Sequence, residues 1–436
     1  MHRTTRITVV LLFAAWTVDY IDRLVINLAL PSIGETFGLS HGARGLIVSA
    51  FFLTYALFQI PGGLLADRFG GVRMASLALV QWSLFTGLTA VAWSFAALLV
   101  IRCFFGAAQG LFPGAALSTL SRRSTPAQRM TATGWLQSSN AVGGLLASVI
   151  ASVLLSLWDW RAMFLTVCLL GVLVLVAVRR WMPAPLPEAD TGADAPRMEG
   201  AVRAVLRSPA IWGFALLFFA YDVVIWGLNS WSGSYLIEER GLHVGSAGLV
   251  TLGPTVLAAA GAVLGGKLSD RFEGRPRRII VPAMLTVAVL LFLLPRTATI
   301  PQFVLCGTLL SGAAGLCYLP CFSVPLRSLP PGLSGVASGI ILFGGQLSGI
   351  LTPTVFGTVV DHFSYEAAFT MLIVGPALAI LVSLRVPQTT PRFLAGFPAA
   401  DGATGVRPDD RMPDDRMQPT GDRTQPAGDR TQTPGA

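Results

Sequence analysis

Long apolar runs recur along nearly the whole chain, and they restrict its possible folds more than any other feature. A helix needs about 20 mostly apolar residues to cross a bilayer. The runs are continuous rather than alternating, which argues against a membrane β-barrel. The expected spans are approximately 7–31, 44–66, 74–93, 96–120, 131–156, 161–181, 208–235, 246–269, 277–295, 299–326, 334–358 and 365–386. The sequence therefore predicts an all-α membrane protein with twelve transmembrane helices.

The composition supports this class and argues against others. Of 436 residues, 53% are hydrophobic and 12% are charged, whereas a soluble domain carries about 25% charged residues. The first apolar segment is too long for a cleaved signal peptide and lacks a small-residue cleavage site, so we expect a retained helix. The five cysteines show no metal-binding spacing, and no Gly-x-x-x-x-Gly-Lys-Ser/Thr phosphate-binding loop occurs. We expect no enzyme, no cofactor and no metal site.

The positive charge is distributed unevenly between the two sides of the predicted bundle. Arginines concentrate between alternate spans, for example Arg122, Arg123 and Arg129, while the opposite loops carry few, such as Arg161 and Arg240. This asymmetry is the positive-inside signal. It explains the net charge of +8 without nucleic-acid binding, and it predicts that both termini lie in the cytoplasm and that the protein crosses the cytoplasmic membrane many times.

The order of segments predicts two halves. We expect a six-helix half at 1–181, a cytoplasmic linker rich in Pro, Ala and charge at 182–207, and a second six-helix half at 208–386. The segment 387–436 is polar and rich in Pro and Gly, so it cannot bury a core and is expected to be a disordered cytoplasmic tail.

A short motif ends the second span of each half. Gly63-Leu-Leu-Ala-Asp67-Arg68 ends one, and Gly266-Lys-Leu-Ser-Asp270-Arg271 ends the other. Glycine lets neighbouring helices approach closely, and an acid or arginine at the mouth can cap or bridge helices. The repetition predicts that Gly63, Asp67, Arg68, Asp270 and Arg271 hold the cytoplasmic gate shut in one state. The alternative is an ordinary positively charged loop.

Charged residues inside the apolar runs indicate where a polar path lies. Asp19, Asp22 and Arg23 sit in the first span and Arg102 in the fourth. A charge at the bilayer centre costs roughly 2.5 kcal/mol or more, so it is a functional-site hypothesis. Arginine offers a planar fork that fits a carboxylate or phosphate, and Arg23 and Arg102 facing one cavity would form an anion site. In the alternative, both are structural and bound to Asp19, Asp22 or backbone carbonyls.

Asp22 is the strongest candidate for a proton carrier. Burial favours its neutral form, and a nearby arginine favours its charged form. Ionised Asp19 and Asp22 would cancel Arg23 and Arg102, and one added proton would leave a net positive site suited to a monoanion. Asp222 in the seventh span is either a further titrating acid or a helix-end residue near water.

Other polar residues interrupt apolar spans and are candidates for the wall of a cavity. Transport sites near the membrane centre draw on several helices from both halves. In the alternative, each of these side chains is satisfied by a neighbouring helix. The candidates are Tyr55, Gln59, Gln137, Asn140, Asn229 and Gln346.

The Gly-x-Leu-x-Asp-Arg motif, present in both halves, resembles the signature loop of the major facilitator superfamily. Tyr20-Ile-Asp-Arg23, the stretch that begins at Arg102 and Trp160-Arg-Ala-Met-Phe164 resemble its anion:cation symporter branch, and the resemblance covers residues 7–386. It implies that the two arginines hold the carboxylate of an organic anion, and that Asp22 couples transport to protons.

Two departures from this family bear on the coupling. The family often has glutamate where this chain has Gln109, and a neutral polar residue where it has Asp19. Glutamine cannot titrate. Asp19 lies one turn from Arg23 on the same helix face, so it either neutralises Arg23 or replaces the missing acid. Gln346 stands where asparagine is common.

Together these features predict a monomeric secondary transporter in the lipid bilayer. The leading hypothesis is proton-coupled uptake of a small organic anion, such as a sugar acid or aromatic carboxylate, by alternating access of the two halves. The first alternative is export of an acidic metabolite or drug-like compound on the same fold. A transporter-like sensor and a channel are further alternatives.

Overall fold

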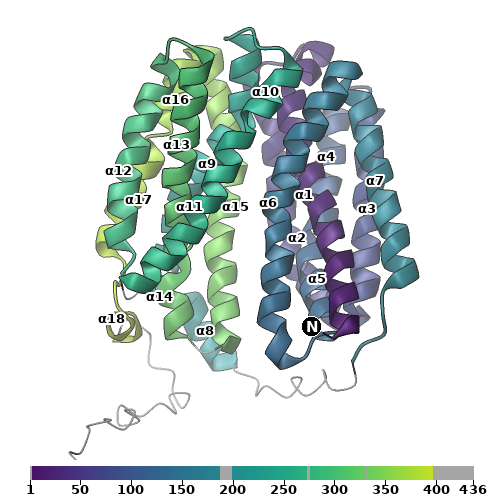
Figure 1. Cartoon of the computed structure of the whole chain (residues 1–436), viewed down its shortest axis with the longest axis vertical. Helices are drawn as coiled ribbons and strands as arrows, with labels where there is room; N and C mark the ends of the chain where they lie inside the picture. The colour runs from purple at the N-terminus through teal and green to yellow at the C-terminus, as the bar shows by residue number, and fades with distance from the viewer. Residues whose placement is uncertain (1, 187–198, 273–274, 330, 396–436) are drawn as a thin grey trace, which may run out of the picture.

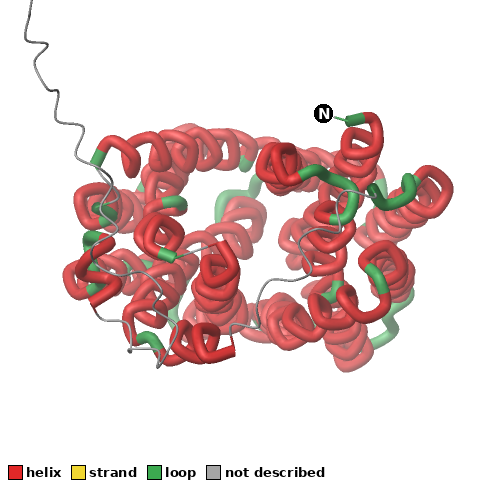
Figure 2. The backbone as a smooth tube through the Cα atoms, turned by 90° about the horizontal axis from the view of Figure 1, so that it is seen from below, coloured by secondary structure: helices red, strands yellow, loops and turns green. Residues whose placement is uncertain are grey.

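The computed structural model of the chain describes residues 2–186, 199–272, 275–329 and 331–395. Every regular element in these residues is a helix, and the helices stand in two bundles side by side (Figures 1 and 2). The first bundle holds α1 (Arg3–Phe37), α2 (His41–Phe69), α3 (Gly71–Ala90), α4 (Phe95–Gly110), α5 (Phe112–Ser121), α6 (Pro126–Leu157) and α7 (Trp160–Trp181). The second holds α9 (Pro209–Glu238), α10 (Val244–Val250), α11 (Leu252–Arg271), α12 (Arg277–Leu293), the 3-10 turn η2 (Leu294–Arg296), α13 (Ile300–Tyr318), α14 (Pro320–Ser328), α15 (Pro331–His362), α16 (Tyr365–Met371) and α17 (Val374–Arg385).

The expected spans agree with these helices to within a few residues. By length and composition, ten of the described segments are able to cross a membrane. α1 and α3 run alongside them in the first bundle (Figure 1) and bring the number in the described residues to twelve. α1 differs from the others because Asp19, Asp22 and Arg23 lie in its middle.

Several expected spans are interrupted rather than continuous. The fourth is divided at Leu111 into α4 and α5, and the eighth at Thr251 into α10 and α11. Pro113 and Pro254 follow these breaks by two and three residues. A proline removes one backbone hydrogen bond and clashes with the carbonyl four residues earlier, which breaks or kinks the helix.

Glycines bring equivalent helix pairs together in the two halves. In the first half, a Cβ on Gly106 of α4 would lie 2.3 Å from the backbone oxygen of Phe51 in α2. In the second, a Cβ on Gly261 of α11 would lie 2.3 Å from the backbone oxygen of Gly312 in α13. Both distances are too short for any larger residue, so glycine sets the spacing of these helices.

The two halves meet at the end of the bundle that holds His41, which we call the His41 end. The imidazole of His41 contacts the Glu238 carboxylate (Nε2 to Oε2, 2.9 Å) and the Asp361 carboxylate (Nδ1 to Oδ1, 2.8 Å). Arg44 forms an ion pair with Glu238, and the Tyr365 hydroxyl donates to Glu238 at 2.7 Å. Two residues of α2 are thus held by α9, α15 and α16.

Close backbone packing continues this contact toward the middle of the bundle. A Cβ on Gly45 of α2 would lie 2.2 Å from the backbone oxygen of Pro353 in α15. The Ser49 and Thr354 hydroxyls are hydrogen-bonded at 2.7 Å. Further along, a Cβ on Gly349 would touch the Phe52 ring at 2.7 Å. The halves are therefore in contact from the His41 end to about the level of Phe52.

The opposite end, which we call the Asp67 end, lacks such contacts in the described residues. A Cβ on Gly63 or Gly339 would meet nothing within 4 Å. Asp270 forms an ion pair with Arg327, but both residues belong to the second half. Asp67 and Arg68 form no ion pair with a described residue of the other half. In this state the described residues of the two motifs form no ion pair between the halves, and their gating role stays a prediction.

The segments outside the twelve spans are partly helical. α8 (Glu199–Arg207) lies in the expected linker. α18 (Thr390–Ala395) lies in the segment expected to be disordered; there the expectation does not hold, because Phe393 is buried against Phe214 with ring centroids 6.4 Å apart. Residues 187–198 and 396–436, which complete the expected linker and tail, lie outside the described residues.

Candidate functional site

The middle of α1 carries a buried ion pair. Arg23 Nη2 lies 3.1 Å from Asp19 Oδ2, and the two side chains are 5% and 2% exposed. The pair follows directly from the sequence, since residues four apart in a helix face the same side. The second oxygen of Asp19 and the Nε of Arg23 are buried and have no hydrogen-bond partner in the described structure.

Aromatic rings cover the rest of the Arg23 guanidinium. Its carbon lies 4.4 Å from the ring centroid of Tyr55, 4.9 Å from that of Tyr20 and 5.4 Å from that of Phe51. A guanidinium over an aromatic face is attracted by the ring quadrupole, more strongly where water is excluded. Tyr55, one of the predicted cavity residues, therefore helps to hold the cation.

Arg102 on α4 is the second buried cation. Its guanidinium lies over the rings of Phe105 and Phe164, at 4.9 and 5.1 Å from their centroids. Its Nε and Nη2 are buried without a hydrogen-bond partner in the described residues. Donors left unpaired inside a protein are costly, so this guanidinium has unused capacity to bind an anion.

Asp22 faces α3 and Arg102 rather than Arg23. One of its oxygens accepts a hydrogen bond from the Thr86 hydroxyl, and Arg102 is its cationic neighbour. Its other oxygen is buried and unpartnered in the described residues. α1 thus presents two acids to two different arginines, Asp19 to Arg23 and Asp22 to Arg102.

The two arginines share one small cavity. It has a volume of about 10 Å³, and its wall also includes Asn27, Phe52 and Trp226. A space of this size holds about one water molecule. Trp226 comes from α9, and its ring centroid lies 4.3 Å from that of Phe52. Both predicted arginines line this space, which is nearly closed in this state.

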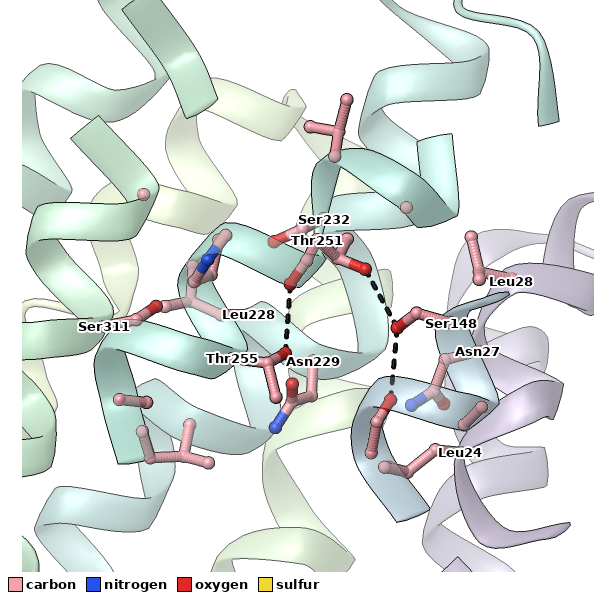
Figure 3. A pocket seen from close by; sticks show the side chains of 18 of the residues that line it. Leu24, Asn27, Leu28, Ser148, Leu228, Asn229, Ser232, Thr251, Thr255 and Ser311 are labelled. Carbon is pink, nitrogen blue, oxygen red and sulfur yellow. Dashed lines mark hydrogen bonds between the residues drawn. The ribbon is translucent and has the colours of Figure 1, made fainter. Parts of the chain in front are cut away.

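A second cavity, of about 270 Å³, lies between the halves (Figure 3). None of its lining residues is charged. Its polar groups are amides and hydroxyls, and Asn27 lines both cavities. The polar lining residues are Tyr20, Asn27, Asn140 and Ser148 from the first half and Tyr221, Asn229, Ser232, Thr251, Thr255 and Ser311 from the second.

One hydrogen bond crosses the wall of this cavity between the halves. The Thr251 hydroxyl at the break between α10 and α11 donates to the Ser148 hydroxyl on α6 at 3.0 Å (Figure 3). The Thr255 hydroxyl donates to the Thr251 carbonyl of its own helix at 3.0 Å. The interrupted helix therefore places hydroxyl groups at the boundary between the halves.

The predicted site residues fall into three groups. Arg23 and Arg102 line the small cavity, and Asn140 and Asn229 line the large one. Tyr55, Gln59, Gln137 and Gln346 line neither cavity in this state. Asp222 is buried on α9, where one of its oxygens would lie 2.1 Å from a Cβ on Gly345, and it also lines neither cavity.

Sequence reasoning missed several lining residues. Asn27 follows Arg23 by one helical turn, so the same spacing that linked Asp19 to Arg23 could have identified it. Ser148, Thr251 and Thr255 gave no signal, because a serine or threonine inside a helix commonly bonds to its own backbone. Phe52 and Trp226, which close the small cavity, look like ordinary apolar residues of a span.

Comparison with known proteins places this geometry in a family. The chain matches the model of the Major Facilitator Superfamily over residues 11–353 and 234–409. It is 28% identical over 414 residues to the hexuronate transporter of Bacillus subtilis, covering 91% of this chain and 96% of that one. It is 25% identical over 425 residues to the probable galactarate/D-glucarate transporter of Escherichia coli, covering 88% and 94%.

Solved structures agree with the fold. A bacterial homologue of the human lysosomal transporter Spinster, described as inward-facing and unoccupied, superposes with a TM-score of 0.74 at 22% identity and covers 91% of this chain and 98% of its own. A D-xylose-proton symporter superposes with a TM-score of 0.71 at 17% identity, covering 87% and 97%. The chain therefore belongs to the major facilitator superfamily, whose members are membrane transporters.

Proposed function

We propose that this transporter carries a small organic anion, best a sugar acid, into the cell together with protons. The observation that carries the proposal is the shared cavity of Arg23 and Arg102. Nε of Arg23 and Nε and Nη2 of Arg102 are buried and unpaired within the described part of the chain, and two such guanidiniums would bind a carboxylate strongly. The named relatives that transport hexuronate and galactarate or glucarate support an anionic cargo.

The large neutral cavity favours a cargo with many hydroxyl groups. It adjoins the arginine cavity at Asn27, and the Oδ1 atoms of Asn27 and Asn140 are buried and unpartnered in the described residues. A sugar acid would place its carboxylate on the arginines and its hydroxyls among these amides and serines. An aromatic carboxylate would leave most of the polar groups unpaired, which is unfavourable.

Asp22 is the proposed proton carrier. It is buried beside Arg102, and one of its oxygens has no partner among the described residues. Protonation removes its attraction for Arg102, which leaves that cation available to an anion. The proton and the anion would thus bind more favourably together than either one alone.

We place the protein in the cytoplasmic membrane. In the proposed orientation, the Asp67 end and both termini face the cytoplasm. Arginines are frequent at the Asp67 end, including Arg122 and Arg180, which fits the positive-inside rule. The described contacts at the His41 end then close the outside in this state. The site lies within one chain between its two halves, and a monomer is sufficient to form it.

The test is uptake of labelled D-glucuronate into liposomes that contain the purified protein and have a more acidic exterior. Unlabelled glucuronate, glucose and benzoate are added as competitors. We expect strong competition by glucuronate, weak competition by benzoate and none by glucose. Losing one buried charged contact to an anion costs about 2–5 kcal/mol, so Arg23→Ala should slow uptake by about two orders of magnitude. Arg180→Ala, at an exposed arginine of α7, is the matched control and should transport normally.

Asp22→Asn tests the coupling in the same liposomes. It should abolish accumulation driven by the proton gradient but keep exchange of internal for external glucuronate, because exchange needs no net proton movement. Normal uptake by Arg23→Ala would remove Arg23 from the site. Unchanged accumulation by Asp22→Asn would move the coupling role to Asp19 or Asp222.

A further inference from the structure

We infer that Asp19 occupies the position on Arg23 that the cargo carboxylate takes, so that Asp19 and the cargo compete for one guanidinium. This inference rests on the proposed function in one respect, which is that Arg23 binds the anion. It adds a regulated competitor within the chain, whose release by a proton opens the binding position.

Arg23 pairs with one carboxylate, that of Asp19, through a single hydrogen bond. Asp19 uses one oxygen and Arg23 one terminal nitrogen, at 3.1 Å. The other Asp19 oxygen and the Arg23 Nε are buried and unpartnered in the described structure. Arginine and a carboxylate can form two parallel hydrogen bonds. A freely moving carboxylate can reach that geometry, while a side chain on the same helix is held to one bond here.

No other acid in the described residues pairs with Arg23. Its other neighbours in the described residues are the rings of Tyr20, Phe51 and Tyr55, and the Tyr55 hydroxyl, which is neutral, also interacts with it. Asp22 is turned to Thr86 and Arg102. Asp19 is therefore the counter-ion that the cargo has to replace.

Few groups in the described residues could mask the charge of Asp19. On its own helix they are Tyr20, Asp22 and Arg23, and α2 adds Tyr55. The next charged groups act one contact further away: Arg102 of α4 on Asp22, and Asp222 of α9 on Tyr20. Gln109 donates through Nε2 to the Asp19 backbone carbonyl at 3.2 Å, not to its carboxylate. The Asp19 carboxylate thus interacts mainly with Arg23.

Charge balance explains the consequence. Removing one partner of a buried ion pair leaves an uncompensated charge, which is strongly unfavourable. A proton bound to Asp19 creates this situation at Arg23, and an incoming carboxylate relieves it. In reverse, loss of that proton restores the Asp19–Arg23 bond and expels the anion. The two roles considered for Asp19, neutralising Arg23 and titrating, then become two states of one residue.

The experiment measures glucuronate binding by calorimetry on the purified full-length protein between pH 5.5 and 8.5, in buffers of different ionisation enthalpy. Wild-type affinity should fall as pH rises, approaching tenfold per pH unit once Asp19 is ionised, with proton uptake on binding. Asp19→Asn removes the competitor. It should bind at least tenfold more tightly than wild type at pH 8.5 and take up about one proton fewer per anion.

Glu35→Gln is the matched control, since it makes the same carboxylate-to-amide change at an exposed position of the same helix. It should show no gain in affinity at pH 8.5. The inference is overturned if Asp19→Asn folds and binds no better than wild type at that pH, or takes up as many protons. Loss of binding in a folded Asp19→Asn protein also overturns it, because removing a competitor cannot weaken binding.

Two further measurements keep the test decisive. If Asp19→Asn does not fold, infrared difference spectra of Asp22→Asn replace it: a protonated-carboxyl band that appears on adding glucuronate supports the inference, and its absence overturns it. Arg23→Ala separates the two proposals. If Arg23→Ala binds glucuronate normally, the proposed anion site fails. If it loses binding while Asp19→Asn behaves like wild type, only the role of Asp19 fails.

Discussion

The two ends of the bundle differ in what joins the halves. At the His41 end, His41 and Arg44 of the first half contact Glu238 and Asp361 of the second, and backbones meet at Gly45. At the Asp67 end, the described ion pair of the repeated motifs, Asp270 with Arg327, stays within one half. In the described residues, the repeated charge motif is therefore not what joins the halves in this state. Side chains that seemed unremarkable in the sequence do so instead.

This difference shows that an ion pair can close one end of the bundle only if its two partners come from different halves. The number of charged residues at that end does not decide it. The sequence repeat at Asp67 and Asp270 was a clear signal, yet those residues make no described contact across the halves in this state. The His41 cluster consists of His41 and Arg44 from α2 and one residue each from three other helices, Glu238 from α9, Asp361 from α15 and Tyr365 from α16. No local sequence pattern connects these residues. The following predictions test whether the His41 end carries the closure.

The largest effect is expected from backbone packing at Gly45. Gly45→Val would place methyl groups where the Pro353 oxygen lies 2.2 Å from a Cβ. Overpacking of this kind costs about 1–3 kcal/mol, so the His41 end should open. Hydrogen exchange at the start of α2 and the end of α15, followed by mass spectrometry, should accelerate by about tenfold or more.

Gly63→Val is the matched control on the same helix. A Cβ at Gly63 meets nothing within 4 Å in this state, so exchange at the His41 end should be unchanged. Equal acceleration by both variants would show that valine disturbs α2 generally and that Gly45 has no special part in closure.

A smaller effect is expected from the charges of the cluster. Glu238→Gln weakens the bonds to His41, Arg44 and Tyr365 at once. The Glu238 side chain is 23% exposed, so solvent screening limits the loss to about 1 kcal/mol. The same exchange measurement should show an acceleration of about fivefold. Glu239→Gln changes the neighbouring acid, which lies outside the cluster, and should have no effect; similar rates for the two variants would argue against the cluster.

Most of the fold could be predicted from the sequence, because lipid leaves few options for an apolar run of 20 residues. The helix breaks could not. Pro31 and Pro61 lie inside unbroken α1 and α2, while Pro113 and Pro254 follow breaks. A proline is compatible with both outcomes, and the packing of neighbouring helices decides between them.

The candidate site likewise has a part that the sequence predicted and a part that it did not. Asp19, Asp22, Arg23 and Arg102 were visible because charge in a membrane span is expensive, and the Asp19–Arg23 pair followed from helical spacing. The large cavity was not visible. Its amides and hydroxyls come from helices far apart in the chain, and polar neutral residues in a span usually bond locally. Charge can be located from one sequence, whereas the shape of a cavity between two halves cannot.

The smallest effect is expected at the Asp67 end. Asp270→Ala removes the ion pair with Arg327. The Asp270 side chain is 78% exposed and that of Arg327 is 39% exposed. Exposed pairs contribute about 0–1 kcal/mol, so thermal stability and exchange at the His41 end should stay close to wild type. If the motif clasps the halves in the opposite state, glucuronate uptake should still slow by severalfold, because that state would be less populated.

Lys267→Ala, at an exposed position of the same helix, should leave both stability and uptake unchanged. Asp270→Ala uptake equal to that of Lys267→Ala would assign the motif no gating role, and faster exchange at the His41 end in Asp270→Ala would mean that the two ends are coupled in this state.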